Sequence, residues 1–216
     1  MKPSCVILGG GGHARGIVDS LQRADAVELR GILDPNRELW GTVCMGVPIL
    51  GADEMLAELV SGGVSLFTVG LGGVGDNQPR QRLFALGLSH GLQPLTVIHP
   101  SATCSGWATV GQGSQLSPGS IVNAGAVLGV NVIVNTGAIV EHDCRIGDHV
   151  HLATGARLSG TVRVGDRAHI GAGAVIRQSI SVGEDAVVGA GAVVVSDVGR
   201  GETVVGNPAR PLGCRG

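Results

Sequence analysis

The feature that most constrains the fold of this chain is a run of apolar residues spaced six positions apart. Seventeen such positions follow one another without a break from Ile98 to Val194, and the residue four places after each is small or apolar. A six-residue period is typical of a parallel β-helix, in which each short strand turns one large and one small side chain inward. Coils stacked about 4.8 Å apart would bury these side chains in a continuous aliphatic column. We therefore predict a β-helix over residues 98–199.

The composition agrees with a thin and regular core. The 216 residues include no Tyr, two Phe and two Trp, and 38 of them are Gly. A core with so few aromatic rings has to be built from many small aliphatic contacts, which suits a β-helix better than a rounded globule. Cys104 and Cys144 fall on inward positions, where we expect small hydrophobic residues rather than reactive thiols. The period leaves the handedness open, although the general rule for parallel crossovers favours a right-handed one.

Residues 1–97 follow a different pattern, in which short apolar runs alternate with segments compatible with helices. We expect "CVILGG" to be a buried strand and "GGGGHARGIVDSLQ" to be a glycine-rich turn followed by a helix. Further strands are expected at "ELRGILD", "SLFTVGLG" and "PLTVIHP", and further helices at "GADEMLAELV" and "QPRQRLFALGLSHG". Repeated strand, turn and helix predict an α/β domain with a parallel sheet over residues 1–97. A C-terminal segment, 200–216, follows the β-helix.

Charge and cysteine usage exclude several classes of function. The net charge of −2 gives no reason to expect a nucleic acid or an anionic membrane as a partner. We recognise neither a run of 18 apolar residues nor a signal peptide. The five Cys are odd in number, scattered and without a CxxC pair, which argues against a disulfide framework and a thiolate metal site. We therefore expect a protein of the reducing cytoplasm that binds no metal.

Three motifs together resemble those of a known enzyme family. They are the hexad run, the closing "VVGNPAR" (204–210) and the leading "VILGGGGHARGIVDSL". They are similar to the bacterial sugar O/N-acyltransferases of the hexapeptide superfamily, which include sialic acid O-acetyltransferases and N-acetyltransferases of nucleotide-linked 4-amino-4,6-dideoxy sugars of the bacillosamine and perosamine type. The resemblance covers essentially the whole chain and implies a Rossmann-like domain followed by a left-handed parallel β-helix. It also implies acetyl-CoA as co-substrate and a homotrimer with active sites between subunits.

The resemblance assigns the general base of acetyl transfer to His142. An imidazole suits this role because its unperturbed pKa lies near neutrality. The next residue, Asp143 where the family usually has Glu, is expected to orient the ring, and Glu141 is the other candidate. Adjacent residues of a strand point to opposite faces, so a contact between His142 and Asp143 requires a turn at a corner of the β-helix. The amine is expected to attack the thioester directly, without an acyl-enzyme.

The remaining residues that the resemblance assigns divide between the two substrates. Four consecutive glycines before a helix offer bare N–H groups to a diphosphate, so the nucleotide is expected there. Residues predicted to bind the nucleotide sugar are Gly10, Gly11, Gly12, His13, Asp34, Gly70 and Asn135. Residues predicted to bind acetyl-CoA are His151, Gly155, Gly160, Ala172, Asn207 and Pro208.

Two points of the site stay open at this stage. Asp34 ends the second strand, where an acid can bind a ribose or a base, but family members that use UDP-sugars often carry a second acid next to it. This chain has Pro35 there, which leaves GDP- and dTDP-sugars open beside UDP-sugars. The role of His149 is also open, and we expect His149 and His169 to be exposed on the β-helix.

Three other functions fit parts of the pattern. O-acetylation of a sialic-acid-like sugar needs the same base and a pocket of similar size, so the sequence does not separate O- from N-transfer. A γ-class carbonic anhydrase shares the β-helix but needs three zinc-bound His, two of them with H-x4-H spacing. His142, His149 and His151 are separated by seven and two residues instead. A non-catalytic scaffold would need neither the acidic-histidine cluster nor the glycine-rich turn. The favoured prediction is an acetyl-CoA-dependent N-acetyltransferase of a nucleotide-linked 4-amino-4,6-dideoxy sugar.

Overall fold

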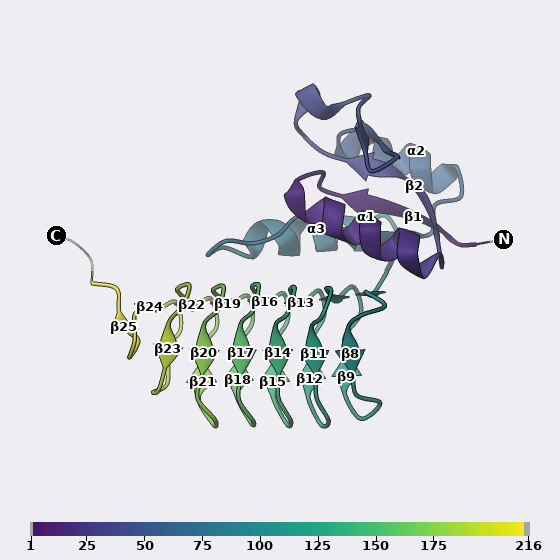
Figure 1. Cartoon of the computed structure of the whole chain (residues 1–216). Helices are drawn as coiled ribbons and strands as arrows, with labels where there is room; N and C mark the ends of the chain where they lie inside the picture. The colour runs from purple at the N-terminus through teal and green to yellow at the C-terminus, as the bar shows by residue number, and fades with distance from the viewer. Residues whose placement is uncertain (1, 214–216) are drawn as a thin grey trace.

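The computed structural model describes residues 2–213 of the chain. Residues 214–216 of the predicted C-terminal segment, including Cys214, lie outside the described residues. Figure 1 shows an α/β unit, purple to blue, lying along one side of a β-helix that runs from teal to yellow. The predicted fold class, an α/β domain followed by a parallel β-helix, is therefore confirmed. Among the described residues, no helix is both long and apolar enough to cross a membrane.

The N-terminal unit is a six-stranded sheet with helices on both faces. Its elements are β1 Ser4–Leu8, α1 Gly12–Ala24, β2 Glu28–Leu33, η1 Arg37–Leu39, β3 Val43–Cys44, β4 Val47–Gly51, η2 Asp53–Met55, α2 Leu56–Ser61, β5 Leu66–Val69, α3 Gln78–Ser89 and β6 Gln93–Pro94. The strand order is β3-β4-β2-β1-β5-β6, and every pair is parallel except the hairpin β3–β4. Helix α1 packs against one face of the sheet, and α2 and α3 pack against the other.

The sequence missed three details of this unit. The strand expected over residues 94–100 is divided, because its apolar run crosses the boundary between the two units: β6 ends at Pro94 in this sheet, whereas Val97–Ile98 forms β7 of the β-helix. The hairpin β3–β4 was not predicted, and the helix expected from residue 51 begins only at Leu56, after the short η2 turn. Both lie in short segments where apolar periodicity is too brief to separate strand, turn and helix.

The central strand of the sheet places the glycine-rich turn next to the segment after β5. Strand β1 pairs with β2 on one side and with β5 on the other, so the connections leave it in opposite directions. In such sheets the carboxyl ends of the strands at this switch form the usual ligand-binding crevice. Gly9 adopts φ +101° there, and a Cβ on Gly70 would lie 2.1 Å from the carbonyl oxygen of Gly9. The two chain segments approach this closely because residue 70 is glycine.

The β-helix consists of seventeen two-residue strands and a short closing pair. Its strands are β7 Val97–Ile98, β8 Thr103–Cys104, β9 Thr109–Val110, β10 Gln115–Leu116, β11 Ile121–Val122, β12 Val127–Leu128, β13 Ile133–Val134, β14 Ile139–Val140, β15 Arg145–Ile146, β16 His151–Leu152, β17 Arg157–Leu158, β18 Arg163–Val164, β19 His169–Ile170, β20 Val175–Ile176, β21 Ser181–Val182, β22 Val187–Val188, β23 Val193–Val194, β24 Thr203–Val205 and β25 Arg210–Pro211. Each hexad residue is the second residue of a strand. Parallel partners such as Val134 and Leu152 are one coil, or three hexads, apart.

Three faces and three corners define positions on the β-helix. The covered face contains β7, β10, β13, β16, β19 and β22, the apolar face contains β8, β11, β14, β17, β20 and β23, and the third face contains β9, β12, β15, β18 and β21. Corner 1 joins the covered face to the apolar face and carries Asn135. Corner 2 joins the apolar face to the third face and carries His142. Corner 3 returns the chain to the covered face and carries His149.

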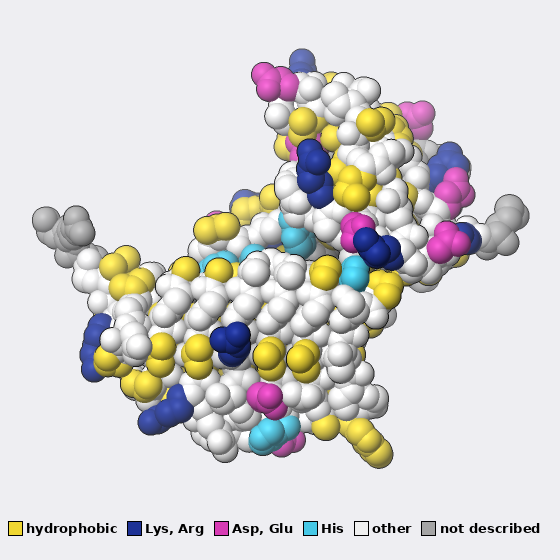
Figure 2. Space-filling model, viewed as in Figure 1, with side chains coloured by type: hydrophobic (Ala, Val, Ile, Leu, Met, Phe, Trp, Pro, Cys, Tyr) yellow, Lys and Arg dark blue, Asp and Glu magenta, His cyan; other side chains and the backbone are white. Residues whose placement is uncertain are grey.

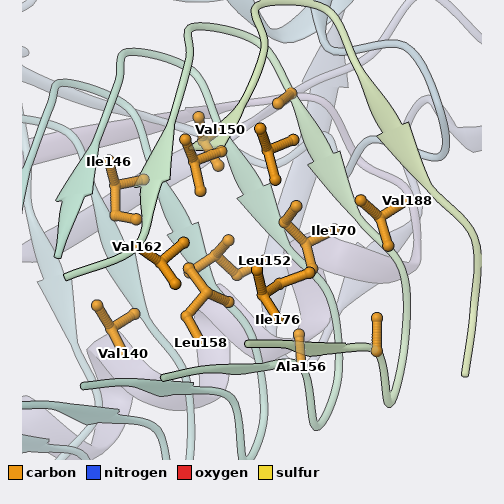
Figure 3. Packing of buried hydrophobic residues seen from close by; sticks show 14 of the residues in the cluster. Val140, Ile146, Val150, Leu152, Ala156, Leu158, Val162, Ile170, Ile176 and Val188 are labelled. Atoms are coloured by element: carbon orange, nitrogen blue, oxygen red, sulfur yellow. The ribbon is translucent and has the colours of Figure 1, made fainter. Parts of the chain in front are cut away.

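The inward side chains form one continuous aliphatic core. Figure 3 shows them stacked from coil to coil, with Val140, Leu158 and Ile176 in a row across successive coils. These three side chains are at most 1% exposed. Burial of a Val, Leu or Ile side chain contributes about 1.5–3 kcal/mol to stability. Cys144 is also fully buried, and burial raises the pKa of its thiol, which fits the predicted role as a small hydrophobic residue.

The α/β unit covers one face of the β-helix and buries outward side chains there. His149 and His169, which we expected to be exposed, are only 8% and 7% exposed. The prediction was wrong because the hexad pattern separates the inside of a coil from its outside but does not show what packs on the outside. His149 packs edge-on against Phe84 of α3, and its Nδ1 accepts a hydrogen bond from the side-chain amide of Asn131 at 3.0 Å.

Candidate active site

A cavity of about 430 Å³ opens where the α/β unit meets the β-helix. Its wall takes residues from the start of α1, from the segment after β5, and from the covered face with corner 1. Four of the residues assigned to the site from the sequence line it, namely Gly12, His13, Asn135 and His151. We call it the interdomain cavity. The tertiary structure thus brings together side chains that lie more than a hundred residues apart in the chain.

His13 is held in one tautomer by a buried glutamine of the β-helix. The side-chain amide of Gln115 donates to the Val69 carbonyl at 2.8 Å and to the Thr68 hydroxyl at 3.2 Å. Its oxygen therefore faces His13 and accepts from Nε2 at 2.6 Å. Burial lowers the pKa of His13 to about 4, so the ring is neutral at pH 7 with the Nδ1 lone pair free. The hexad pattern marks Gln115 as outward but carries no signal that a domain covers it, so the sequence missed this residue.

His151 is fixed in a similar way at the other wall of the interdomain cavity. Its Nδ1 donates to the Gly73 carbonyl at 2.5 Å, because a carbonyl can only accept. Its Nε2 accepts from the Asn135 amide at 3.3 Å. Burial, with a further contribution from the nearby His169, lowers the pKa of His151 to about 3. Both His13 and His151 are therefore suited to accept hydrogen bonds and poorly suited to take a proton near pH 7.

Arg80 of α3 joins the two units below this cavity. Its guanidinium is fully buried and donates to the Leu71 carbonyl and to both the carbonyl and the side-chain oxygen of Asn131 at corner 3. Burial lowers the pKa of Arg80 to about 9, and its charge adds to the lowering of the pKa of His13 and His151. Nothing in the sequence distinguishes Arg80 from the other arginines.

His142 and Asp143 contact each other directly at corner 2. Nδ1 of His142 lies 2.9 Å from Oδ2 of Asp143. Asp143 has φ +59°, in the left-handed region that non-glycine residues seldom adopt, and this turn brings adjacent side chains to the same side. Glu141 instead accepts a hydrogen bond from the Asn123 amide at 3.0 Å. Of the two candidates for orienting His142, Asp143 is thus the one that contacts its ring.

Gly160 lies directly beside the His142 ring in the next coil. A Cβ at this position would lie 2.5 Å from Nε2 of His142. The absence of a side chain at Gly160 therefore leaves room for the imidazole, with Nε2 opposite the nitrogen that contacts Asp143. The side chain of His142 is 55% exposed.

The structure separates His142 from the interdomain cavity of the same chain. Asn135 lies at corner 1, before β14, and His142 lies at corner 2, after β14. His142, Asp143 and Gly160 are not among the wall residues of the interdomain cavity. The predicted base and the predicted acceptor site are therefore on opposite edges of the apolar face within one chain.

A second cavity, of about 440 Å³, continues from the first along corner 1. It shares Gly73, Val74, Asn135 and His151 with the interdomain cavity. Farther along it is lined by small residues of the later coils, including Ala172 and Ala190. We call it the coil cavity. Of the six residues predicted to bind acetyl-CoA, His151 and Ala172 line it, whereas Gly155, Gly160, Asn207 and Pro208 are not among its wall residues.

A third cavity, of about 510 Å³, lies at the carboxyl edge of the sheet and includes Gly9 and Asp34. The carboxylate of Asp34 accepts from the Gly10 amide at 2.6 Å and from the Asn36 amide at 2.9 Å. Asp34 therefore anchors the glycine-rich turn, and the Gly10 N–H is not free. The N–H groups at the start of α1, beginning near Gly11 and Gly12, lack helical partners as at any helix N-terminus. We call this the sheet-edge cavity.

No metal cluster accompanies these cavities in the described part of the chain. The structure groups no three His, Cys, Asp or Glu side chains over residues 2–213 in an arrangement that could hold a metal ion. The closest pair of imidazoles in the interdomain region, His151 and His169, packs edge to face with ring centroids 5.0 Å apart.

Comparison with known proteins places both units in described families. Residues 4–85 match the family model described as the PglD N-terminal domain, and residues 161–196 match the hexapeptide repeat of succinyl-transferase. Among curated protein sequences, none matches the chain.

Solved structures resemble the chain over nearly its whole length. A histidine-to-asparagine mutant of perosamine N-acetyltransferase from Caulobacter crescentus, in complex with CoA and GDP-perosamine, is 38% identical with a TM-score of 0.90 and covers 98% of this chain and 97% of that one. The acetyltransferase domain of PglB from Neisseria gonorrhoeae is 37% identical with a TM-score of 0.88, covering 98% and 100%. WeeI from Acinetobacter baumannii is 29% identical with a TM-score of 0.84, again covering 98% and 100%.

These similarities extend through the glycine-rich turn, the hexads and the junction between the two units. Identity of 38% over almost the full length of both chains exceeds what a shared fold alone would give. The chain therefore belongs to the sugar acyltransferases of the hexapeptide, left-handed β-helix superfamily.

Proposed function

We propose that this protein transfers the acetyl group of acetyl-CoA to the amino group of a nucleotide-linked 4-amino-4,6-dideoxy sugar. The observation that carries the proposal is the meeting of two cavities at Asn135 and His151, which line both. One cavity leads from there to the start of α1, and the other leads along the coils. A donor in the coil cavity and an acceptor in the interdomain cavity would bring a thioester and an amine together at these two residues.

The nucleotide sugar is expected to extend along the carboxyl edge of the sheet. Gly9 and Leu71 line the sheet-edge cavity, and Gly12 and Gly72 line the interdomain cavity. A diphosphate lying between the two cavities would therefore face the N-terminus of α1, where unpaired N–H groups favour an anion. The Asp34 carboxylate retains unused lone pairs for a ribose hydroxyl. The sugar would then reach His13, whose free Nδ1 accepts a hydrogen bond.

The proposed general base is His142, oriented by Asp143. Nε2 of His142 removes a proton from the attacking amine as the nitrogen bonds to the thioester carbon, and the carbon–sulfur bond breaks to release CoA. General base catalysis of this kind contributes about 10²–10⁴-fold. The pKa values of His13 and His151, about 4 and about 3, make these neutral rings poor competitors for the role. Gly160, beside Nε2, leaves space for the thioester to approach.

We further propose that the active unit is a homotrimer with each site completed by a neighbouring subunit. Figure 2 shows a row of hydrophobic side chains along the apolar face, interrupted by one basic residue. The outward residues of this face are Thr103, Ile121, Ile139, Arg157, Val175 and Val193. Packing of this face against another subunit would bury the row and bring His142 of one chain to Asn135 of another. The four described free cysteines agree with a reducing cytoplasm.

A panel of acceptors tests the reaction itself. Purified protein is incubated with acetyl-CoA and UDP-, GDP- or dTDP-linked 4-amino sugars, or with free sialic acid, and the CoA thiol released is measured. Release with an amino sugar, with an N-acetyl product identified by mass spectrometry, supports the proposal. Release with sialic acid alone supports O-acetylation instead, and binding of acetyl-CoA without turnover of any acceptor supports a scaffold.

Mixed subunits test the shared site. Variants His142→Ala and Asn135→Ala are each expected to have little activity, because every site then lacks one of the two side chains that it requires. Unfolding and reassembling them together should restore part of the wild-type rate, because some interfaces then combine an intact His142 with an intact Asn135. No recovery in a mixture that forms normal trimers would indicate that one chain supplies both residues.

A further inference from the structure

The sheet-edge cavity contains two charged side chains that have no hydrogen-bond or ion-pair partner among the described residues. Its apolar walls come from Leu71, Leu83 and Leu86, and its polar groups come from Asp34, Asp53 and Arg82. The carboxylate of Asp34 already accepts from two backbone amides. Asp53 and Arg82, in contrast, take part in none of the side-chain hydrogen bonds or ion pairs of residues 2–213. A free carboxylate and a free guanidinium therefore stand in one leucine-walled cavity.

The carboxylate of Asp53 lies at the ligand-binding edge of the sheet and stabilises no other part of the described fold through a side-chain hydrogen bond. Asp53 lies in the short η2 turn that follows β4, at the edge of the sheet where ligands bind. Partial burial, and secondarily the neighbouring Glu54 and Asp34 carboxylates, raise its pKa. His90 offsets part of this effect, and a carboxylate without a hydrogen-bond partner in such surroundings gains from donors that a ligand supplies.

We propose that the sheet-edge cavity binds guanine, so that this chain selects a GDP-linked sugar. The carboxylate of Asp53 accepts from guanine N1–H and from the exocyclic N2 amino group. The guanidinium of Arg82 donates to guanine O6 and N7, the pairing that arginine makes with this base elsewhere. The leucine side chains cover the flat faces of the ring. The inference rests on the proposed function, because it assigns the base of the same nucleotide sugar.

The other bases match these two groups less well. Uracil and thymine present a single donor, N3–H, flanked by two carbonyl oxygens that a carboxylate repels. Adenine presents the N1 lone pair beside its amino group, so a carboxylate at that edge gains one hydrogen bond and one repulsion. A volume of about 510 Å³ has room for a purine. The residue that follows Asp34 is Pro35, so strand β2 is not followed by two consecutive acids.

The position of the cavity fits the direction of a nucleotide sugar. Gly9 lines the sheet-edge cavity and Gly12 lines the interdomain cavity, so a base in the first would place its diphosphate along the glycine-rich turn between them. The sugar would then enter the interdomain cavity toward His13 and Asn135. The order base, diphosphate, sugar thus follows the order of the cavities along the edge of the sheet.

Binding of nucleoside diphosphates to the full-length protein tests the assignment without knowledge of the sugar. Calorimetric titrations with GDP, IDP, ADP, UDP and dTDP are compared for the wild type, Asp53→Asn, Arg82→Gln and the control Glu54→Gln. Glu54 is the exposed acid next to Asp53 and is not a wall residue. GDP is expected to bind at least about tenfold more tightly than UDP, dTDP or ADP. IDP, which lacks the N2 amino group, should bind with intermediate affinity.

The variants identify which group reads the base. Asp53→Asn should weaken GDP about tenfold and remove the difference between GDP and IDP, while UDP binding changes little. Arg82→Gln should weaken GDP and IDP alike, and Glu54→Gln should bind as the wild type does. Tighter binding of UDP or dTDP than of GDP would overturn the guanine assignment but leave the proposed function intact. A protein that binds none of these diphosphates would overturn both.

Discussion

The β-helix and the α/β unit use different means to hold residues in place. In the β-helix every coil repeats the last, so residues eighteen positions apart, such as Ile139 and Arg157, lie side by side at each level. The α/β unit has no such period, and its core contains the pair Phe67 and Phe84, whose rings are tilted relative to each other with centroids 5.6 Å apart. A periodic core fixes positions from local spacing, whereas an aperiodic one fixes them by long-range packing.

The difference determines where chemistry is placed. In the β-helix, the proposed catalytic pair His142–Asp143 sits at a corner, outside the buried core column. In the α/β unit, His13 depends on Gln115, a residue from the other unit. The proposed base is thus a local feature, and the proposed substrate-binding groups are features of the interface between units.

The largest expected effect comes from His142→Ala. Removal of the base should lower kcat about 10²–10⁴-fold, while acetyl-CoA binding stays near the wild-type level. Steady-state kinetics with the best acceptor and calorimetric titration with CoA measure the two quantities. His90→Ala, which alters an imidazole of the α/β unit that lines none of the three cavities described above, is the control. A His142→Ala rate close to that of the wild type would remove His142 from the mechanism.

The β-helix core is tested by Leu158→Ala. Leu158 is 1% exposed and stacks between Val140 and Ile176, whose strands are held in place by the ladder of backbone hydrogen bonds. The cavity left behind cannot collapse easily, so we expect a loss of about 2–5 kcal/mol in the free energy of unfolding. Urea denaturation measures it, with the exposed outward residue change Arg163→Ala as control, expected within about 0.5 kcal/mol. Equal losses in both variants would contradict a uniform aliphatic core.

The junction between the units is tested by pH. The pKa values of His13 and His151 are lowered from 6.5 to about 4 and about 3. Between pH 6.5 and these lowered values, the folded state therefore binds fewer protons than the unfolded state. Their contribution to stability is therefore complete above pH 6.5 and decreases as the pH falls toward the folded-state values. Each histidine should contribute a slope of up to about 1.4 kcal/mol per pH unit. Urea denaturation at several pH values measures it, and the double variant His13→Asn, His151→Asn should flatten the profile; an unchanged slope in that variant would place its origin elsewhere.

The smallest effect in this series is expected from Gly160→Ala. The new Cβ would lie 2.5 Å from Nε2 of His142, so the ring must move and kcat should fall about tenfold. Gly106 provides a matched control, because it is a corner 2 residue of an earlier coil and a Cβ there meets nothing within 4 Å. Gly106→Ala should therefore keep the wild-type rate. Equal rates in the two variants would show that Nε2 needs no clearance from this coil.

Much of the fold was predictable because its periods are local. The hexads from Ile98 to Val194 predicted every two-residue strand of the β-helix, including the inward places of Cys104 and Cys144. The alternation of apolar runs and helical segments predicted the order of the α/β elements. The hairpin at β3–β4 escaped prediction because two very short strands carry no period of their own.

The site was predictable to the extent that it depends on motifs. The glycine-rich turn, His142 and Asn135 were singled out from the sequence, and their roles remain predictions. The sequence left Asp143 and Glu141 as alternatives, because the choice depends on the left-handed φ at residue 143. It gave no indication of Gln115 or Arg80, because both act through contacts across the junction of the two units.

The sequence by itself determined the β-helix, its register and the inward or outward direction of each residue, because a period of six fixes all three locally. Only the tertiary structure decided which outward face is covered. The packing of the α/β unit on that face buries His149, His151 and His169 and lowers their pKa values. The physical reason is that a repeat specifies its own coil and its neighbours, whereas burial from outside depends on a domain encoded elsewhere in the chain.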